Sequence, residues 1–288
     1  MKRNVSSHRA QGFLTISRII CYIVLSLLCV LCLFSFYFLI INASRPHAEI
    51  MSQISFAPGN YLFKNLSNLL ADENIPMVRG LLNSLFISSC TALLTTYFSA
   101  LTAYGVHAYN FRFKKIAFAF IMLIMMVPTQ VSVLGFLQLV AKMGMRDTFY
   151  PLILPSIAAP IVFYYMKSYM ESVLPLEIIE AARVDGSNEF WTFNRIVLPI
   201  IKPALAVQAI FSFVTSWNNY FTPSLIIDTN TNKTIPILIY QLRSADYQKF
   251  DVGQVYIMIF VAIIPLLIIY IFLSKFIIKG LTLGSVKG

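Results

Sequence analysis

The segment EAARVDGSNEFWTFNRIVLP, Glu180–Pro199, shows how this chain is organised. It is acidic and aromatic, and it lies between two apolar runs in a chain that is otherwise short of acids. Pro175 suits the first position of a helix, and Asp185–Asn188 is a strong turn signal because glycine adopts the left-handed backbone that ends a helix. A second helix is predicted from about Asn188 to Val197. We therefore predict a helix–turn–helix, called the insert and delimited as residues 171–203.

The composition is that of an integral membrane protein. Apolar residues make up 58% of the 288 residues and charged residues only 12%, against about 45–50% and about 25% in soluble domains. A soluble fold cannot hide that much apolar surface, so we predict an all-α membrane protein with six transmembrane helices. The first span is longer than the apolar part of a signal peptide, and we expect it to be retained. The predicted spans are Ile19–Ile41, Gly80–Val106, Ile116–Val140, Phe149–Met166, Ala204–Ile227 and Gln254–Ser274.

Basic residues are distributed unequally across these spans. With the N-terminus inside, the inner segments carry 14 Lys and Arg and the outer segments 8, and the two sides have net charges of +9 and +1. Lys and Arg are enriched in cytoplasmic loops. The asymmetry predicts that both termini and the insert are cytoplasmic. It also accounts for the net charge of +10 without a nucleic-acid partner.

Residues that carry chemistry are scarce. No Asp, Glu, Lys or Arg lies in the central part of any predicted span, which argues against ion coupling and favours an uncharged polar solute. The four cysteines and three histidines lack the spacing of a metal site, so none is expected. The sequence has no G-x-x-x-x-G-K-[ST] nucleotide loop and no convincing catalytic constellation. We therefore predict a non-catalytic chain that borrows its energy from another protein.

Two predicted spans carry polar stripes. In the second span, small residues recur at intervals of three or four and share one helix face, which we interpret as a close-packing seam in preference to a lining role. These residues are Ser84, Ser88, Thr91, Thr95, Ser99 and Thr102. In the fifth span the same spacing puts Gln208, Ser212, Thr215 and Asn219 on one face. This face either hydrogen-bonds to neighbouring helices or lines a wet cavity, and both alternatives stay open.

Aromatic and amide side chains gather near the outer half of the fifth span. Trp217, Asn218, Asn219 and Tyr220 together suit a sugar, which offers apolar ring faces and hydroxyls. An interfacial aromatic belt is the alternative for the two aromatic residues. The candidates for a translocation pathway are Gln208, Ser212, Thr215, Asn218 and Asn219.

The insert carries too many apolar residues for a free loop. We predict that it docks in a groove of another protein, with Phe190 and Trp191 as anchors and with Ala181 and Ala182 allowing close approach. A helix lying on the membrane is the alternative, but such helices are normally rich in Lys and Arg. In this segment acids outnumber bases.

The insert also matches a known pattern. Glu180–Ala182, Asp185–Gly186 and Ile196–Pro199 have the spacing of the "EAA" coupling loop, so the chain resembles the permeases of binding-protein-dependent ABC importers of type I, with a MetI-like fold. Ser187 is one departure, since the family usually has alanine there, but serine is nearly as small.

The resemblance covers most of the chain from about residue 83. NSLFISSCTALLTTYFSALTAYG (Asn83–Gly105) is similar to the opening core helix of the family, and SWNNYF (Ser216–Phe221) to the fifth-helix segment of sugar importers. GLTLGSVKG (Gly280–Gly288) is similar to the tail of maltose-type subunits. After Lys279 the chain is polar and rich in glycine, so we expect no helix there.

The resemblance implies roles for particular residues. In the family the loop sits in a cleft of a cytoplasmic ATPase and transmits its closure to the membrane helices, and the maltose-type tail reaches between the two ATPase subunits. Glu180 is then expected to contact the ATPase, and Gly186 to permit the sharp turn. The implied coupling residues are Glu180, Ala181, Ala182, Asp185, Gly186, Phe190, Trp191, Leu198 and Pro199. The implied tail contacts are Gly284, Ser285, Val286, Lys287 and Gly288.

The resemblance also implies a complex in the bacterial cytoplasmic (inner) membrane. This chain would pair with a second permease subunit, two ATPase subunits and an extracytoplasmic sugar-binding protein. ATP and Mg would be bound by the ATPase, with no cofactor in this chain. The implied cargo is a carbohydrate, and specifically an oligosaccharide, that is not chemically changed.

The expected organisation follows from the spans and the resemblance. The first helix lies outside the family core, and we expect it to pack on the periphery, against the partner permease. The expected parts are a cytoplasmic N-terminus (1–18), a peripheral first helix (19–41), an extracytoplasmic loop (42–79), a five-helix core with the insert (80–274) and a cytoplasmic tail (275–288).

Two alternatives remain for the function. An ABC permease for a peptide, amino acid or phosphate would be expected to carry charged residues in its spans. Another uncharged or zwitterionic solute is compatible with the uncharged spans of this chain. A membrane-embedded glycosyl or acyl transferase needs catalytic carboxylates near the membrane surface. Asp72 and Glu73 are the only tempting pair, and solvated loop acids explain them better.

Overall fold

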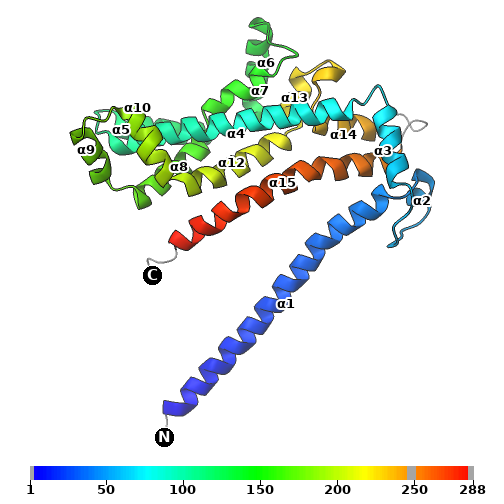
Figure 1. Cartoon of the computed structure of the whole chain (residues 1–288), viewed down its shortest axis with the longest axis horizontal. Coiled ribbons are helices and arrows are strands. Elements are labelled where there is room, and N and C mark those ends of the chain that lie inside the picture. Colours follow the sequence, from blue (N-terminus) through cyan, green and yellow to red (C-terminus); the bar gives the residue numbers. More distant parts are fainter. Residues whose placement is uncertain (1–2, 245–250, 285–288) are drawn as a thin grey trace. The chain divides into compact units, whose positions relative to one another are not determined.

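The structure, a computed structural model, describes residues 3–244 and 251–284. Its contacts divide the chain into two units, Met1–Leu69 with Asp246–Phe260 and Leu70–Ala245 with Val261–Gly288. All regular secondary structure in the described residues is helical (Figure 1). This confirms the predicted all-α class.

The first unit contains an ordered polar core. Its helices are α1 (Arg3–Ala43), α2 (His47–Ser52), most of α3 (Leu62–Ala71) and the first part of α15 (Val252–Gly284). The buried Asn65 donates from Nδ2 to the carbonyl oxygens of Ala43 at 3.0 Å and Arg45 at 2.9 Å. Arg45 is itself buried and forms an ion pair with Glu49 at 3.4 Å. The segment after the first predicted span is therefore folded by its own hydrogen bonds.

The second unit is built around α4 (Met77–Ala108). Its other elements are α5 (Lys114–Ile124), α6 (Thr129–Lys142), α7 (Tyr150–Ile153), the 3-10 turn η1 (Leu154–Ile157), α8 (Pro160–Val173), α9 (Leu176–Val184), α10 (Glu189–Thr192), the π-helical turn η2 (Phe193–Val197), α11 (Leu198–Ile200), α12 (Lys202–Trp217), α13 (Phe221–Ile226), the 3-10 turn η3 (Asn230–Asn232), α14 (Ile235–Arg243) and the rest of α15. Both α8 and α12 pack along α4 (Figure 1).

All six predicted spans are helical, but only three are single long helices. Within the described residues, Ser17–Ala43, Met77–Ala108 and Val252–Phe272 are long and apolar enough to cross a membrane. A fourth candidate joins Glu189–Ile200 to Lys202–Trp217 through a bend of 84°. This bend is the point where the insert turns into α12.

The third and fourth predicted spans are broken at prolines. The third stops at Ile124 and resumes as α6 after Pro128, which is the cap residue of that helix. The fourth is interrupted before Pro160 and then continues to Val173. A residue that precedes proline is pushed out of the α conformation, so each break follows from the local sequence.

The fifth and sixth predicted spans have different ends from those expected. The fifth stops at Trp217, ahead of two asparagines, and Thr222 N then donates to Asn219 Oδ1 at 3.4 Å as α13 begins. The sixth continues to Gly284, so the prediction that no helix follows Lys279 is wrong. Glycine costs about 1 kcal/mol in a helix interior, which the cooperativity of a long helix tolerates.

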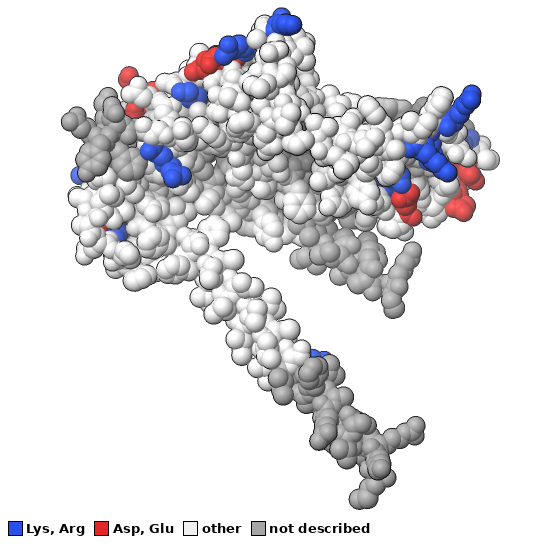
Figure 2. Space-filling view, turned by 180° about the vertical axis from the view of Figure 1, so that it is seen from behind, with Lys and Arg blue, Asp and Glu red and all other residues white. Residues whose placement is uncertain are grey.

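The charged side chains are segregated from the middle of the helices. On the face shown in Figure 2, Lys, Arg, Asp and Glu gather toward the helix ends and leave the surface between them without charge. An uncharged surface of this kind suits lipid, where charged groups are costly. The chain is a multi-pass membrane protein.

Candidate functional site

The insert is a helix–turn–helix, as predicted. Pro175 is the cap residue that precedes α9, one position earlier than expected. Gly186 has a φ of +78°, the left-handed conformation that the turn requires. Asn188 then caps α10, because its Oδ1 accepts a hydrogen bond from Trp191 N at 2.8 Å. The second predicted helix is not one α-helix, since it continues through the π-helical turn η2 into α11.

The inner face of the insert is locked to α4. Phe193, Val197 and Ile179 are almost fully buried in one cluster with residues from α4 and α8. The Phe193 ring lies 5.5 Å from the Tyr104 ring and 5.7 Å from the Tyr97 ring, centroid to centroid. This apolar packing fixes the insert to the C-terminal half of α4 and to α8.

A polar cluster adds to this attachment. Glu189 Oε1 accepts from Arg183 Nε at 2.6 Å, which closes the turn between the two helices of the insert. Glu189 Oε2 accepts from the Tyr104 hydroxyl of α4 at 2.5 Å. The Arg183 guanidinium also lies over the Tyr109 ring, 5.0 Å from its centroid. Glu189 therefore joins both halves of the insert to α4, and its role was missed in the sequence because Tyr104 is far away along the chain.

The electrostatics favour the ionised form of Glu189. Burial raises the pKa of its carboxyl, but the hydrogen bonds from Arg183 and Tyr104 outweigh burial and hold the pKa below its ordinary value. The carboxylate is thus charged at neutral pH and available as an acceptor to both partners.

The outer face of the insert is apolar and exposed. Phe190 is 70% exposed and Trp191 50%, so both predicted anchors are free to contact another protein. Val184, at 88%, extends this face and was not predicted. The predicted coupling residues Glu180, Ala181, Asp185, Gly186 and Pro199 are also exposed, and Leu198 is half-buried.

One predicted contact residue is buried inside the chain. Ala182 is only 5% exposed, because it packs on the inner face of α9 and its carbonyl accepts from Ser187 N at 3.0 Å. The prediction that Ala182 allows close approach of a partner is therefore wrong. Ala181, its exposed neighbour, keeps that prediction.

The predicted tail contacts lie mostly outside the described residues. Gly284 is the last residue of α15. Ser285, Val286, Lys287 and Gly288 fall outside the part of the chain that the structure describes. Their predicted role stays a prediction.

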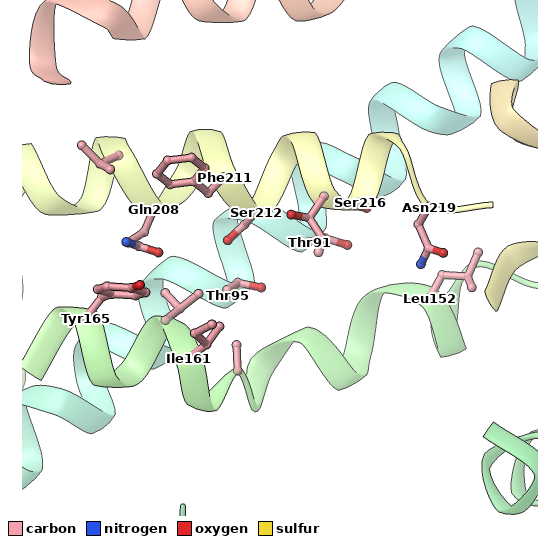
Figure 3. Close-up of a pocket in the computed structure, with 14 residues that line it drawn as sticks. Thr91, Thr95, Leu152, Ile161, Tyr165, Gln208, Phe211, Ser212, Ser216 and Asn219 are labelled. Carbon is pink, nitrogen blue, oxygen red and sulfur yellow. The ribbon is translucent and has the colours of Figure 1, made fainter. Parts of the chain in front are cut away.

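A second feature is a cavity between α4, α8 and α12, with a volume of about 710 Å³ and a largely apolar wall that also carries polar side chains (Figure 3). None of its lining residues is charged. The lining residues are Thr91, Thr95, Leu152, Ala159, Ile161, Val162, Tyr165, Val207, Gln208, Phe211, Ser212, Thr215, Ser216 and Asn219. Hydroxyls and amides alternate with apolar groups, which suits a neutral solute rich in hydroxyl groups.

Four of the five pathway candidates line this cavity. Gln208, Ser212, Thr215 and Asn219 lie on its wall, so the cavity alternative holds for their helix face. Asn218 is not on that wall, and its Nδ2 donates to the carbonyl oxygen of Val214 at 3.0 Å. It is the C-cap residue of α12, and its predicted place on a pathway stays a prediction.

The stripe on α4 is only partly a packing seam. Four of its members are buried, as that interpretation requires. They are Ser84, Ser88, Thr95 and Ser99. The interpretation is wrong for Thr91, which lines the cavity, and for Thr102, which is exposed. Thr95 is a packing residue that also lies on the cavity wall. At the helical break before Pro160, Thr95 and Ser99 of α4 donate to the carbonyl oxygens of Ser156 at 3.1 Å and Ala159 at 3.4 Å.

Two aromatic residues of the cavity were missed. Tyr165 of α8 and Phe211 of α12 line its wall (Figure 3). The four-residue spacing of Ile161 and Tyr165 puts them on one face of α8, but the sequence does not show which helix faces them. Trp217, in contrast, is buried and stacks on Phe213 at 5.6 Å. It is a core residue and belongs neither to a sugar site nor to an interfacial belt.

Two loops at the far end of α12 from the insert are joined by Asp147. Its Oδ1 accepts from the backbone N of Asp228 at 3.0 Å and of Thr229 at 3.1 Å, and its Oδ2 accepts from the Thr229 hydroxyl at 2.8 Å. Asp147 has a φ of +57°, which Asp and Asn tolerate better than other side chains. Burial raises the pKa of its carboxyl, but the hydrogen bonds from Thr229 and Asp228 outweigh burial and lower the pKa overall.

Asp147→Asn is expected to lower the melting temperature by about 2–4 °C at pH 7, because a charge-assisted hydrogen bond becomes a neutral one. A lowered folded pKa means that the stabilisation is present above the unfolded pKa and lost as the pH falls through the folded one. The difference between wild type and variant should therefore shrink below about pH 4. Thermal unfolding of both proteins across pH checks this, and a constant difference would contradict it. Asn keeps the backbone conformation, so strain does not confuse the comparison.

The comparisons with known proteins agree with this architecture. The family described as "Binding-protein-dependent transport system inner membrane component" matches residues 80–282. The arabinooligosaccharides transport system permease protein AraQ of Bacillus subtilis (strain 168) is 32% identical over 268 residues, covering 91% of this chain and 93% of that protein. The trehalose/maltose transport system permease protein MalG of Thermococcus litoralis is 28% identical, covering 95% of this chain and 98% of that protein.

Further comparisons concern another sugar permease and the fold. The lactose transport system permease protein LacG of Rhizobium radiobacter is 29% identical, covering 93% of this chain and 96% of that protein. A chain in the crystal structure of a bacterial ABC transporter involved in the import of the acidic polysaccharide alginate superposes with a TM-score of 0.79 at 18% identity, covering 91% of this chain and 97% of that chain. The match over residues 80–282, together with the insert and the uncharged cavity, leads to one assignment: the chain belongs to the family of inner membrane components of binding-protein-dependent transport systems.

Proposed function

We propose that this chain is one of two permease subunits of an ATP-driven importer for a carbohydrate, and specifically an oligosaccharide. The named substrates of AraQ, LacG and MalG support the carbohydrate class. Separate ATPase subunits bind ATP and Mg and hydrolyse the nucleotide, and this chain holds no cofactor. The cargo crosses without chemical change.

The observation that carries the proposal is the two-faced insert. Its inner face is fixed to α4 by Phe193 and Glu189, whereas its outer face exposes Val184, Phe190 and Trp191. Large apolar side chains exposed on a protruding segment mark a protein–protein contact. A groove of the ATPase that closes on this face would move α4 with the insert. Because α4 also lines the cavity, the movement would reach the solute pathway directly.

The proposed orientation puts the insert and both termini in the cytoplasm of a bacterial cell, in accordance with the distribution of Lys and Arg. The loops around Asp147 then face outward, where the extracytoplasmic binding protein delivers the sugar. The second permease subunit completes the wall of the cavity, to which this chain contributes α4, α8 and α12.

Glu180→Lys is expected to reduce sugar uptake about tenfold, because it reverses a charge on the exposed face that the ATPase contacts. Uptake of radiolabelled oligosaccharide by intact cells, normalised to the amount of the chain in the membrane, measures the effect. Glu73→Lys is the matched control, since Glu73 is an exposed acid in a different loop. Equal uptake by wild type and Glu180→Lys would contradict the proposal. Loss of uptake in Glu73→Lys alone would favour a catalytic carboxylate instead.

Ser212→Phe is expected to reduce uptake at least about tenfold while the complex still assembles, because the ring fills the middle of the cavity without introducing a charge. Ser212→Ala should transport normally, since it removes one hydroxyl and does not reduce the volume of the cavity. The same uptake assay checks both variants. Full uptake by Ser212→Phe would show that the solute takes another route.

A further inference from the structure

A small polar chamber adjoins the Asn219 end of the cavity. It has a volume of about 20 Å³ and shares Leu152, Ser216 and Asn219 with the cavity wall. Its other lining residues are Ser84, Ile87, Ser88, Pro223 and Thr234. Five of the eight lining residues carry a hydroxyl or an amide, so the chamber is far more polar than its apolar surroundings.

Two hydroxyls in this chamber have no hydrogen-bond partner among the residues that the structure describes. Ser88 Oγ and Thr234 Oγ1 are fully buried and form no hydrogen bond to protein, and the two residues are 1% and 4% exposed. Leaving a buried hydroxyl unpaired is costly, and buried polar groups nearly always find a protein or water partner. A polar chamber of about this size holds one water molecule, which needs two to four polar partners.

The chamber lies where three segments meet. Ile235 N, at the start of α14, donates to Ser84 Oγ at 2.8 Å. The preceding residue, Asn83, donates from Nδ2 to the carbonyl oxygens of Thr231 at 2.8 Å and Lys233 at 3.0 Å. The loop before α14 is therefore already fastened to α4, and Ser216 and Asn219 bring in the end of α12. A water bound here would connect α4, α12 and α14 at one point.

We propose that the chamber holds one ordered water that bridges the hydroxyls of Ser88 and Thr234, and that this water forms a latch at the Asn219 end of the cavity. The latch helps to keep α4, the end of α12 and the loop before α14 together in the resting state. Its role in transport rests on the proposed function, whereas the water site itself does not. The ligand is a single neutral water molecule and not an ion, because none of the lining residues is charged.

The sign of a stability change tests the water site. In the purified complex, Ser88→Ala and Thr234→Val are each expected to lower the melting temperature by about 2–4 °C, because each removes one partner of the bridging water. The double variant should lose less than the sum of the two, since both groups serve one bridge. If the chamber is dry, each substitution removes an unpaired buried hydroxyl and leaves the melting temperature unchanged or raised. That result, or a high-resolution map of the complex without density between the two hydroxyls, would overturn the proposal. A bound monovalent cation in its place would overturn it as well.

The latch is tested by ATP hydrolysis without the binding protein. Weakening a contact that holds the resting state should raise this basal rate about two- to tenfold in Ser88→Ala and in Thr234→Val. Thr102→Val is the matched control, because the exposed Thr102 hydroxyl donates only to the Phe98 carbonyl of its own helix. An unchanged basal rate in both variants would overturn the latch. A wild-type complex that hydrolyses no ATP at all would contradict the proposed function instead.

Discussion

Replacing Phe193 by alanine is expected to lower the free energy of unfolding by about 3–5 kcal/mol, the usual cost of removing a fully buried aromatic side chain. Phe193 is 0% exposed, and its ring contacts both Tyr97 and Tyr104 of α4. Its removal opens a cavity at the place where the insert is attached to the bundle. Thermal or denaturant unfolding of the purified chain in detergent measures the effect. We expect uptake to be lost together with stability.

Phe190→Ala is the matched control for this prediction. Phe190 lies one helical turn away in the same insert, but its side chain is 70% exposed. Its loss should change the free energy of unfolding by less than about 0.5 kcal/mol, as surface substitutions do. It should still weaken the association with the ATPase, because Phe190 is on the outer face. Equal destabilisation by the two substitutions would show that the insert has no distinct inner and outer face.

Replacing Glu189 by alanine is expected to reduce transport about tenfold for each ATP hydrolysed. The Tyr104 hydroxyl is buried and would lose its acceptor, at a cost of about 1–3 kcal/mol, and Arg183 would lose its ion pair. The insert would then follow the ATPase without moving α4 to the same extent. We count Glu189 as a positioning residue, because it acts through Tyr104 and not on the solute.

The ratio of uptake to hydrolysis separates this role from a loss of folding. A merely structural defect would lower the amount of complex and reduce both rates together, whereas loss of coupling leaves hydrolysis in place. Tyr104→Phe, which removes only the donor to Glu189, should shift the ratio in the same direction. Glu177→Gln is the control, since Glu177 is an exposed acid on the first turn of α9. An unchanged ratio in Glu189→Ala would refute the positioning role.

The insert was predictable because its signals are local. Gly186 and Asn188 act on the few residues next to them, so the turn and the start of the second helix follow from the segment itself. Which residues of the insert face inward was harder to predict. Ala182 and Ala181 are equivalent in composition, and only the packing of α9 on the bundle distinguishes them.

The ends and breaks of the spans were less predictable. Hydropathy is averaged over a window and is insensitive to a single proline. The helices on either side of the breaks before Pro128 and Pro160 were therefore predicted as continuous spans. The breaks nevertheless have local causes, because the residue before proline is displaced from the helical conformation. The hydrogen bond that Asn219 Oδ1 accepts from Thr222 N, in contrast, depends on side-chain geometry and was not visible in the sequence.

The cavity was predicted from one side only. The spacing of Gln208, Ser212, Thr215 and Asn219 identified the wall that α12 contributes. The opposite wall could not be predicted without the tertiary structure. Tyr165 belongs to α8, and the residues that α8 turns toward the cavity depend on the break before Pro160. The same limit applies to Glu189, whose partner Tyr104 lies on another helix.

The central claim is that a separate ATPase grips the outer face of the insert. The most direct test is to purify this chain from native membranes through an affinity tag and to measure the ATPase activity of the preparation. The wild type is compared with the double variant Phe190→Asp, Trp191→Asp. The account predicts hydrolysis in the wild-type preparation and its loss in the double variant, which should still insert in the membrane in normal amounts because both side chains are exposed. A wild-type preparation without ATPase activity, or a double variant that retains all of it, would contradict the account.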